Sequence, residues 1–494
     1  MAHALMFQGT GSDVGKTVLV AGLCRALKNR GLRVRPFKPQ NMSNNAAVAD
    51  DGGEIGRAQW LQALACGVPP SIHMNPVLLK PQSETGSQIV VHGKVRGQAK
   101  GRDYQALKAT FLDAVLESFE RLKAEADVVV VEGAGSPAEI NLRKGDIANM
   151  GFATAANVPV ILVGDIDRGG VIASLVGTHT VLPSADRAMI AGYMINKFRG
   201  DVSLFDDGLK SVTEFTGWPS FGVLPWQPSA ARLPAEDSVA LERLSRGSEG
   251  GLKIAVPVLG RIANFDDLDP LASEPGVDLV YLKPHDPWPE DAFVFIIPGS
   301  KSTIGDLAQF IALGWDERLS AAHQNGATIV GICGGYQMLG RTVSDPEGIE
   351  GPAKSVAGLG LLDVETVMKR EKTVRNARAI SVDGRHELEG YEIHLGETTG
   401  PDTERSVVDF DGRGDGATSK DGRVFGTYLH GLFDSGAYRK AFLERYGVFS
   451  DGVDHRLRVY AALDELAEAI EDKLDVDAML GVAASFSKAK RGAA

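Results

Sequence analysis

Cysteine is scarce in this chain, which has only three among its 494 residues. Three cysteines cannot form a disulfide framework, and their spacing matches no zinc-binding motif. Long hydrophobic runs are missing too: the longest apolar stretches, at 127–131 and 157–163, fall far short of the roughly 20 residues that span a bilayer. No charged leader with a cleavage site precedes the first Gly-rich loop. We therefore expect a protein of the reducing cytoplasm that does not bind membranes.

An excess of positive charge is absent as well. Lys and Arg number 52 against 64 Asp and Glu, and the resulting net charge of −12 disfavours a general nucleic-acid binder. Hydrophobic residues make up 44% of the chain, charged residues 23% and aromatic residues 7%, which is typical of a folded α/β protein. Because 494 residues exceed one ordinary core, we expect two or three domains.

The first domain is predicted over residues 1–225, where short β-branched runs alternate with longer helical patterns. Continuous apolar strands separated by helices predict a parallel sheet covered on both faces. The pattern fails over 226–251, a Pro- and Gly-rich stretch that we interpret as a linker. The strands predicted in this domain are 3–8, 32–37, 127–132, 158–164 and 189–195.

A second α/β domain in tandem is predicted over residues 252–445, followed by a C-terminal extension at 446–494. In the extension, residues 456–472 have the pattern of an amphipathic helix, and 487–494 that of a frayed tail. The strands predicted in the second domain are 253–258, 277–282, 293–297, 327–332, 389–394 and 423–429.

A phosphate-binding loop is predicted at residues 9–17, which read Gly-Thr-Gly-Ser-Asp-Val-Gly-Lys-Thr between a strand and a helix. Glycines such as Gly11 and Gly15 let backbone N–H groups converge on phosphate oxygens. Lys16 supplies positive charge, and Thr17 offers a hydroxyl to Mg²⁺. The loop therefore predicts binding of ATP with Mg²⁺.

Two further strand ends carry candidate ligands of that nucleotide. Glu132 ends a buried strand before a Gly-rich turn, a place suited to a carboxylate that binds Mg²⁺ directly or through water. Asn196 ends another strand, and its carboxamide could pair with an adenine edge. The alternatives are a solvated carboxylate for Glu132 and an ordinary turn residue for Asn196.

The loop resembles that of dethiobiotin synthetase, because its first glycine is Gly9 and Thr10 stands in the usual glycine position. Segments along the rest of the first domain resemble the cobyric acid synthase family. One departure is the pair Asn44 and Asn45, where that family would lead us to expect Leu-Asn. The segments that carry the resemblance are 36–43, 51–59, 74–81, 132–141, 146–150 and 165–170.

The resemblance implies two substrate-binding residues in the first domain. Lys38 ends the second predicted strand, where a dethiobiotin-synthetase-like fold directs a lysine at the group being activated. Asp146 follows the Gly-rich turn after Glu132 and is expected to face the same cleft. A helix-capping role for Asp146 is the open alternative.

A thiol nucleophile is predicted in the second domain. A β-branched strand ends in Gly-Ile-Cys-Gly-Gly at 331–335, and a helix pattern follows. This is the pattern of a nucleophile elbow with Cys333 in place of serine, since small neighbours permit the strained turn and the helix N-terminus lowers the thiol pKa. Cys24 and Cys66 have the pattern of buried structural cysteines.

The thiol needs a base. His430 follows a predicted strand in Tyr-Leu-His-Gly, and strand ends host catalytic groups. His394, in Tyr-Glu-Ile-His-Leu-Gly, is the competing candidate.

These features resemble a class I glutamine amidotransferase domain, which implies a flavodoxin-like fold. In that family the elbow cysteine and the histidine of Tyr-Leu-His-Gly are the catalytic pair, which here are Cys333 and His430. Backbone N–H groups near Gly299 and Gly334 are then expected to bind the oxyanion of glutamine hydrolysis. The usual third member, a Glu two residues after the histidine, is replaced by Leu432, and Glu392 is a candidate substitute from a neighbouring strand.

The two resemblances together imply an amidoligase that uses glutamine and ATP on a corrinoid. They imply amidation of the b, d, e and g carboxylates of adenosylcobyrinic acid a,c-diamide in cobalamin biosynthesis, although nothing in the composition itself indicates a corrinoid. The nearest alternative is cobyrinic acid a,c-diamide synthase. A ParA-like partitioning ATPase would need a lysine where this chain has Gly11, and a glutamine sensor with an inactive second domain would fit Leu432. The sequence does not indicate an oligomeric state.

Overall fold

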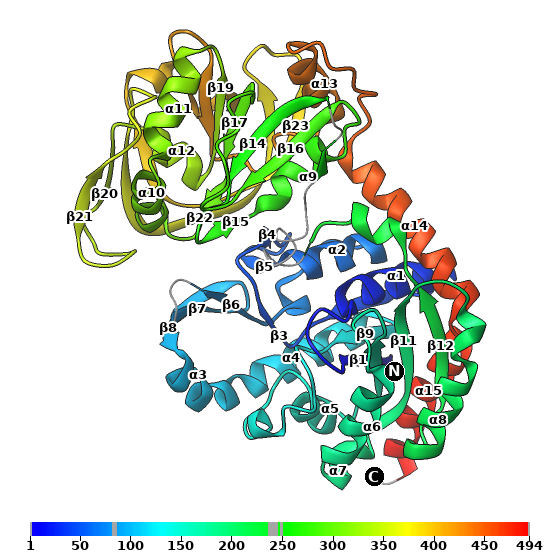
Figure 1. Cartoon of the computed structure of the whole chain (residues 1–494). Helices are drawn as coiled ribbons and strands as arrows, with labels where there is room; N and C mark the ends of the chain where they lie inside the picture. The colour runs from blue at the N-terminus through cyan, green and yellow to red at the C-terminus, as the bar shows by residue number, and fades with distance from the viewer. Residues whose placement is uncertain (1, 82–85, 236–245, 248–249, 493–494) are drawn as a thin grey trace. The chain divides into compact units, whose positions relative to one another are not determined.

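The computed structural model describes residues 2–81, 86–235, 246–247 and 250–492 (Figure 1). The chain forms two compact units. Most of the predicted linker, at 236–245 and 248–249, lies outside the described residues. Unit 1 comprises 1–43, 49–234 and 459–494, and unit 2 comprises 44–48 and 235–458.

Unit 1 contains a six-stranded sheet in which every pairing is parallel. Each strand predicted in this part of the chain overlaps a strand of this sheet, because continuous apolar runs mark strands covered on both faces. The edge strand β12 was not predicted. In spatial order the strands are β12 (Ser220–Pro225), β11 (Ile190–Phe198), β10 (Val160–Asp165), β1 (His3–Gly9), β9 (Val128–Glu132) and β2 (Val34–Phe37).

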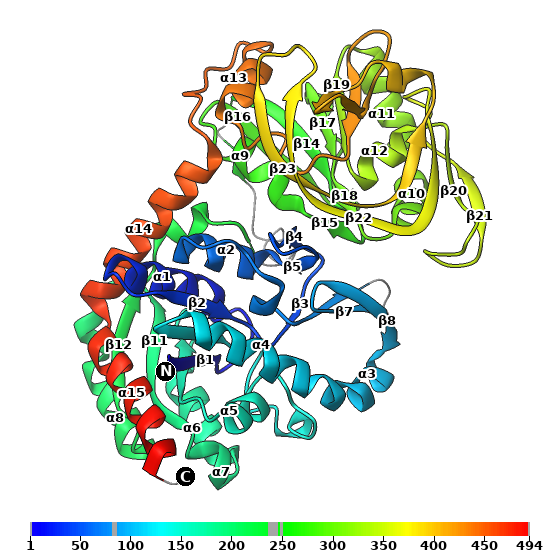
Figure 2. The same cartoon turned by 180° about the vertical axis from the view of Figure 1, so that it is seen from behind.

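Helices cover both faces of this sheet, as predicted. Alternation along β1 sends Leu5 and Phe7 into one buried cluster and Ala4 and Met6 into the other. Side chains of α1 (Lys16–Asn29), α2 (Arg57–Cys66), α14 (His455–Lys473) and α15 (Val476–Gly492) join the first cluster. Side chains of α4 (Leu112–Glu125), α5 (Met150–Ala156), α6 (Val171–Val181) and α8 (Asp206–Thr216) join the second. These four helices are labelled in Figure 2.

The C-terminal helices belong to the core of unit 1. Gly22 of α1 allows close approach of α14, since a Cβ there would lie 2.6 Å from atoms of Leu466 and Ile470. Arg25 of α1 forms an ion pair of 2.6 Å with Asp464 of α14. The helix predicted at 456–472 is therefore present. The frayed tail predicted at 487–494 is wrong as far as residue 492, because α15 continues to Gly492.

A smaller sheet is inserted in unit 1 between β2 and α4, and its strands were not predicted. Its strands are short, and the residues of the last one, at 94–100, are mostly exposed and lack a continuous apolar run. In spatial order they are β3 (Gln40–Met42), β6 (Val77–Pro81), β7 (Gly86–Val91) and β8 (Lys94–Lys100). Of the helices in the described part of the chain, none combines the length and the apolar character needed to span a membrane.

Unit 2 is built on a second parallel sheet. Numbered along the chain, its five parallel strands have the spatial order 2-1-3-4-5, which is the flavodoxin-like order that the sequence predicts. Antiparallel strands flank them, β13 (Arg246–Gly247) within the predicted linker and β26 (Ala417–Thr418) at the other edge. The parallel strands are β16 (Val277–Leu282), β14 (Leu252–Pro257), β17 (Val294–Ile297), β19 (Thr328–Ile332) and β27 (Val424–Thr427).

A long hairpin extends unit 2 beyond this sheet. Its strands are β22 (Glu365–Ser381) and β23 (Glu387–Thr399), which pair antiparallel. The strand predicted at 389–394 lies within β23. Its partner β22 was missed, because its exposed Lys, Arg and Glu residues interrupt the apolar pattern. The hairpin positions the polar residues near Cys333 described below.

Candidate nucleotide and glutamine sites

The predicted phosphate-binding loop connects β1 to α1 in unit 1. Gly15 has φ +90°, and a Cβ there would lie 2.5 Å from Nδ2 of Asn196, so both conformation and space require glycine. Asn196 donates from Nδ2 to the carbonyl of Val14 at 2.8 Å. The observed contact of Asn196 therefore supports the loop itself, and its contact with adenine stays a prediction.

Lys16 lies at the start of α1 and is buried. Its Nζ donates to the carbonyl of Gly135 at 3.3 Å, which places the lysine beside the Gly-rich turn after β9. At Gly11, none of the described atoms lies within 4 Å of the position that a Cβ would take. Gly11 therefore faces open space, as a residue that approaches a phosphate must.

Glu132 is the centre of a buried polar cluster at the end of β9. Its side chain is fully buried, and Oε1 accepts hydrogen bonds from the Thr17 hydroxyl at 2.7 Å and from Lys38 Nζ at 2.8 Å. Gln62 of α2 donates to Oε2 at 2.6 Å. The structure thus brings together three predicted residues from separate segments. Gln62 was missed, because its short helix carries no recognisable motif.

Asp146 caps a helix in this structure. Its carboxylate accepts hydrogen bonds from the backbone N–H groups of Ala148 at 2.9 Å and Gly151 at 2.8 Å, at the start of α5. Lys108 lies 3.6 Å away. The observed contacts are those of the capping alternative, and a role for Asp146 in substrate binding stays a prediction.

Cys333 occupies the sharp turn between β19 and α12 (Gly334–Leu339) of unit 2. Its backbone has φ 53° and ψ −109°, a conformation that non-glycine residues rarely adopt. A Cβ on Gly334 would lie 2.8 Å from the backbone N of Ser300, so the turn tolerates no side chain there. The turn has the geometry of the predicted elbow, and the role of Cys333 as a nucleophile stays a prediction.

His430 lies against Cys333 and is held by a carboxylate. Its Nδ1 is 2.7 Å from Oδ2 of Asp267, and Oδ1 of Asp267 accepts the N–H of Gly431 at 2.8 Å. Burial alone lowers the pKa of His430, but the charge and hydrogen bond of Asp267, together with the hydrogen bond to Cys333, raise it to about 10. Asp267 therefore contacts His430, and His430 contacts Cys333, which is the arrangement that a carboxylate, base and nucleophile require. Their catalytic roles stay predictions.

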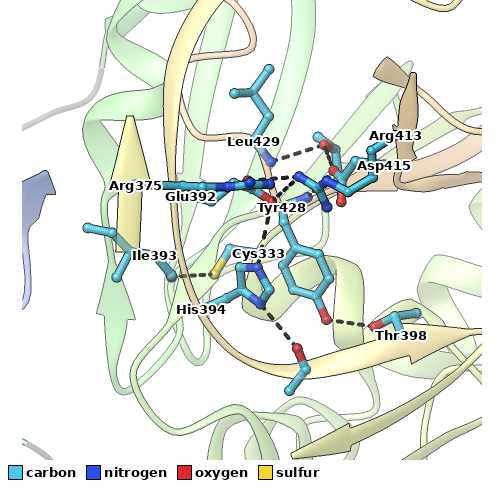
Figure 3. A network of polar contacts seen from close by, with 12 residues as sticks. Cys333, Arg375, Glu392, Ile393, His394, Thr398, Arg413, Asp415, Tyr428 and Leu429 are labelled. Carbon is cyan, nitrogen blue, oxygen red and sulfur yellow. Dashed lines mark hydrogen bonds and ion pairs between the residues drawn. The ribbon is translucent and has the colours of Figure 1, made fainter. Parts of the chain in front are cut away.

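The suggestion that Glu392 replaces the missing third residue is wrong. Glu392 is fully buried, but its carboxylate is bound by Arg375, by Arg413 at 2.9 Å and by His394 (Figure 3). Burial raises its pKa, and these hydrogen bonds outweigh burial and lower it to about 2. Glu392 therefore balances two arginines. Asp267 lies in an acidic segment after β14, and only its distant contact with His430 distinguishes it from its neighbours.

His394 lies near Cys333, but its own contacts are with other groups. Its ring stacks on Tyr428 with the centroids 3.7 Å apart, and its Nδ1 lies 3.2 Å from the carbonyl oxygen of Gly396 (Figure 3). The Sγ of Cys333 donates to the carbonyl oxygen of Ile393, the residue before His394, at 3.5 Å. The geometry therefore favours His430 over His394 as the base.

The predicted oxyanion loop is fixed beside this site. Gly299 pairs with Ala263 through the short strands β18 (Gly299–Ser300) and β15 (Ile262–Ala263), and a Cβ on Gly299 would lie 3.5 Å from Cε1 of His430. Asp306 accepts a hydrogen bond from the Ser300 hydroxyl at 2.6 Å. Burial raises the pKa of Asp306 to about 6. The loop is thus held close to Cys333 and His430.

Comparison with known families assigns both units. Residues 5–240 match the model of the CobQ/CobB/MinD/ParA nucleotide binding domain, and residues 253–438 match that of the CobB/CobQ-like glutamine amidotransferase domain. A nucleotide-binding unit joined to a glutamine amidotransferase unit defines a glutamine-dependent amidoligase.

Curated relatives narrow this class. The chain is 69% identical over 475 residues to the cobyric acid synthase of Sinorhizobium fredii, covering 96% of this chain and 98% of the relative. It is 67% identical over 484 residues to that of Allorhizobium ampelinum, covering 97% and 100%. The chain belongs to the cobyric acid synthase family. The predicted resemblance is confirmed, and the alternative of a cobyrinic acid a,c-diamide synthase is not favoured.

Proposed function

We propose that this chain amidates the b, d, e and g carboxylates of adenosylcobyrinic acid a,c-diamide, with glutamine as the nitrogen donor and ATP as the activating substrate, in cobalamin biosynthesis. The observation that carries the proposal is the presence of two complementary sites in one chain. One is the cluster of Thr17, Lys38 and Gln62 on Glu132, and the other is the set of Cys333, His430 and Asp267.

Glutamine hydrolysis would take place in unit 2. Nε2 of His430 accepts the proton of Cys333, and the thiolate attacks the side-chain amide carbon of glutamine. Backbone N–H groups at Gly299 and Gly334 stabilise the oxyanion, and His430 returns the proton to the departing ammonia. Water then cleaves the thioester to release glutamate. Asp267 would hold the proton on Nδ1 and stabilise the imidazolium that forms when Nε2 takes the thiol proton.

Carboxylate activation would take place in unit 1. The corrinoid carboxylate attacks the γ-phosphate of ATP, and ADP leaves as an acyl phosphate forms. Ammonia from glutamine then attacks the acyl carbon and displaces inorganic phosphate, which leaves a carboxamide. Lys16 and the backbone N–H groups at Gly11 and Gly15 would bind the phosphates, and Asn196 fixes the loop that carries them.

The residues at the end of β9 fit a magnesium ion. Mg²⁺ prefers hydroxyl, carboxylate and phosphate oxygens, and Thr17 and Glu132 supply the first two within 2.7 Å of each other. The ion would neutralise charge on the transferring phosphoryl group. Lys38 donates to the carboxylate of Glu132 at 2.8 Å and would hold the acyl phosphate. Because Cys333 must remain a free thiol, we also assign the chain to the reducing cytoplasm.

Mass spectrometry of the corrinoid product tests the proposal. The enzyme is incubated with cobyrinic acid a,c-diamide, in its adenosylated and unadenosylated forms, together with ATP, Mg²⁺ and glutamine. Four successive conversions of carboxyl to carboxamide are expected. Amidation of cobyrinic acid at only its a and c positions, with the a,c-diamide left unchanged, would instead identify a cobyrinic acid a,c-diamide synthase.

A further inference from the structure

The loop predicted to bind the oxyanion lies directly against the turn that carries Cys333. It comprises residues 299–304, between β17 and the first turn of α10 (Thr303–Ala312). A Cβ on Gly334, the residue after Cys333, would lie 2.8 Å from the backbone N of Ser300. At such close range, the position of the loop determines whether its backbone N–H groups reach an oxyanion formed at Cys333.

Asp306, in the first turn of α10, binds one end of this loop. The side chain is buried, and its Oδ2 accepts the Ser300 hydroxyl at 2.6 Å. Both carboxylate oxygens also accept the backbone N–H of Arg261 at 3.1 Å. Arg261 immediately precedes β15, and the chain then leads to Asp267. Asp306 therefore ties the loop to the segment that carries the carboxylate partner of His430.

Glu350 binds the other end of the loop. Its two carboxylate oxygens accept the backbone N–H groups of Thr303 at 3.0 Å and Ile304 at 2.9 Å. Glu350 lies in the turn after β20 (Thr342–Asp345), and Asp345 holds this turn by accepting the N–H of Glu350 at 2.8 Å. The hydroxyl of Thr303 donates to Oε1 of Gln337 in α12 at 3.0 Å. This end of the loop is therefore tied to α12 and to the strand that follows it.

Burial of the two carboxylates has an electrostatic cost. It raises the pKa of Asp306 to about 6 and also raises the pKa of Glu350, and the hydrogen bonds from the loop and from Arg261 offset only part of this effect. Groups whose pKa is shifted in this way concentrate at functional sites. The cost is consistent with a requirement for the exact position of the loop, beyond the capping of α10 by Glu350.

We propose that Asp306 and Glu350 are positioning residues for glutamine hydrolysis, which hold residues 299–304 so that the backbone N–H groups of the loop meet the oxyanion. When the thiolate of Cys333 attacks the amide carbon of glutamine, the C=O π electrons move to oxygen, and these N–H groups stabilise the charge. Displacement of the loop weakens hydrogen bonds that form only as this charge develops, so it slows the reaction more than it weakens glutamine binding. The role rests on the glutamine hydrolysis of the proposed function.

Two conservative variants test this role. Glu350→Gln places an amide N–H against one of the two loop N–H groups, and Asp306→Asn places one against the N–H of Arg261 in either orientation of the amide. Glutamate release is measured with ATP, Mg²⁺ and cobyrinic acid a,c-diamide present. In both variants kcat should fall about 10- to 100-fold. KM for glutamine should change little.

Two reagents that react with Cys333 separate loop position from general damage to the site. Glutamate γ-semialdehyde adds its aldehyde carbon to the thiol, and the thiohemiacetal oxygen then lies where the oxyanion forms. Its dissociation constant should rise in proportion to the fall in kcat. This constant is measured as protection of Cys333 from iodoacetamide and needs no turnover. Iodoacetamide alkylates the thiolate by displacing iodide and forms no oxyanion, so its rate without the aldehyde should be the same in wild type and in both variants.

The matched control is Asp402→Asn, since Asp402 is a buried carboxylate of unit 2 that accepts the backbone N–H of Asp363 at 2.8 Å. Its kcat and aldehyde affinity should match those of the wild type. Ser300→Ala removes only the hydroxyl contact with Asp306, and it should lower kcat and aldehyde affinity by a smaller factor. This variant tests the role if either carboxylate variant fails to fold.

Wild-type kcat and aldehyde affinity in Asp306→Asn and Glu350→Gln would overturn the positioning role. A rise in KM with kcat unchanged would overturn it in favour of glutamine binding, and alkylation slowed as much as kcat would overturn it in favour of damage to the site. If the wild type amidates no corrinoid, the proposed function fails, and the aldehyde affinities still decide the role of the two carboxylates.

Discussion

Asp267 and His430 are separated by 163 positions in the chain, and their side chains meet at 2.7 Å between Oδ2 and Nδ1. Asp267→Asn keeps the shape but removes the charge that holds Nδ1 protonated. Glutamine-driven amidation should fall by about 10³- to 10⁴-fold, the scale for loss of a carboxylate that orients a catalytic histidine. Ammonia-driven amidation should be unchanged. Steady-state rates with the two nitrogen sources measure both.

The control for that prediction is Glu392→Gln, which alters the other buried carboxylate near Cys333. Because Glu392 binds Arg375 and Arg413, its loss should lower stability more than it lowers the glutaminase rate. The reverse pattern, with the large kinetic loss in Glu392→Gln, would assign the orienting role to Glu392.

Cys333→Ala should abolish amidation from glutamine and leave the synthetase reaction intact. Free ammonia at high concentration and alkaline pH should restore product, because unprotonated ammonia reaches the acyl phosphate without glutamine. Cys24→Ala is the matched control, since Cys24 is a buried thiol packed in the core of unit 1. Equal losses with glutamine and with ammonia in Cys333→Ala would show that Cys333 is structural.

Lys16→Ala should depress amidation with either nitrogen source. Removing a preorganised charge from the transferring phosphates costs about 3–4 kcal/mol of transition-state stabilisation, or roughly 10²- to 10³-fold in rate. Lys28→Ala, at the exposed end of the same helix, should be close to wild type. Initial rates over a series of ATP concentrations make the comparison. Near-normal turnover in Lys16→Ala would contradict the phosphate-loop assignment.

Lys38→Ala should slow amidation while nucleotide binding survives, because we propose that Lys38 holds the group being activated, and Glu132 retains Thr17 and Gln62. Titration calorimetry with a non-hydrolysable ATP analogue gives the nucleotide affinity. Lys80→Ala is a close control for stability, since Lys80 forms a similarly buried ion pair of 2.7 Å with Glu54. Loss of nucleotide affinity with corrinoid affinity intact would contradict the role given to Lys38.

The pairing of His430 with Asp267 should make stability depend on pH. Burial lowers the pKa of His430, but Asp267 and Cys333 raise it from 6.5 to about 10 in the folded chain. The folded state therefore holds a proton that the unfolded state releases above pH 6.5. The stabilisation is complete below that pH and is lost as the pH rises toward 10. Urea unfolding across this range should show a decline in wild type that His430→Gln lacks, and parallel curves for the two proteins would contradict the pairing.

Local patterns in the sequence predicted the parallel strands of the two large sheets except β12, and the two turns that carry Lys16 and Cys333. These features depend on residues close together in the chain: glycines, an apolar strand before them and a helix after them. Asp267 and Gln62 could not be predicted in this way, because each is defined by one contact with a residue far away, His430 or Glu132. Glu392 was a reasonable candidate from its strand, but sequence spacing does not show that arginines neutralise it.

The place of the C-terminal helices in the fold also depends on contacts with residues far away in the chain. Their amphipathic pattern predicts a buried face but not the partners that bury it, which include α1 for α14 and the strands β1 and β12 for α15. The same limit applies to residues 44–48, whose sequence shows a departure from the expected Leu-Asn but not their contact with Asn264.

The packing of α14 and α15 against α1 has a consequence for how the protein is made. Because α1 is translated first and these helices last, the face of α1 that they cover stays exposed while the ribosome synthesises unit 2. Gly22 and Arg25 of α1 meet Leu466, Ile470 and Asp464 of α14 only when the chain is nearly complete. A premature stop codon before α14 would therefore leave unit 2 able to fold while unit 1 remained a target for chaperones and proteases. Unit 1 can complete its fold only after the whole chain has been translated. A complete synthetase unit is therefore not released without the glutaminase unit.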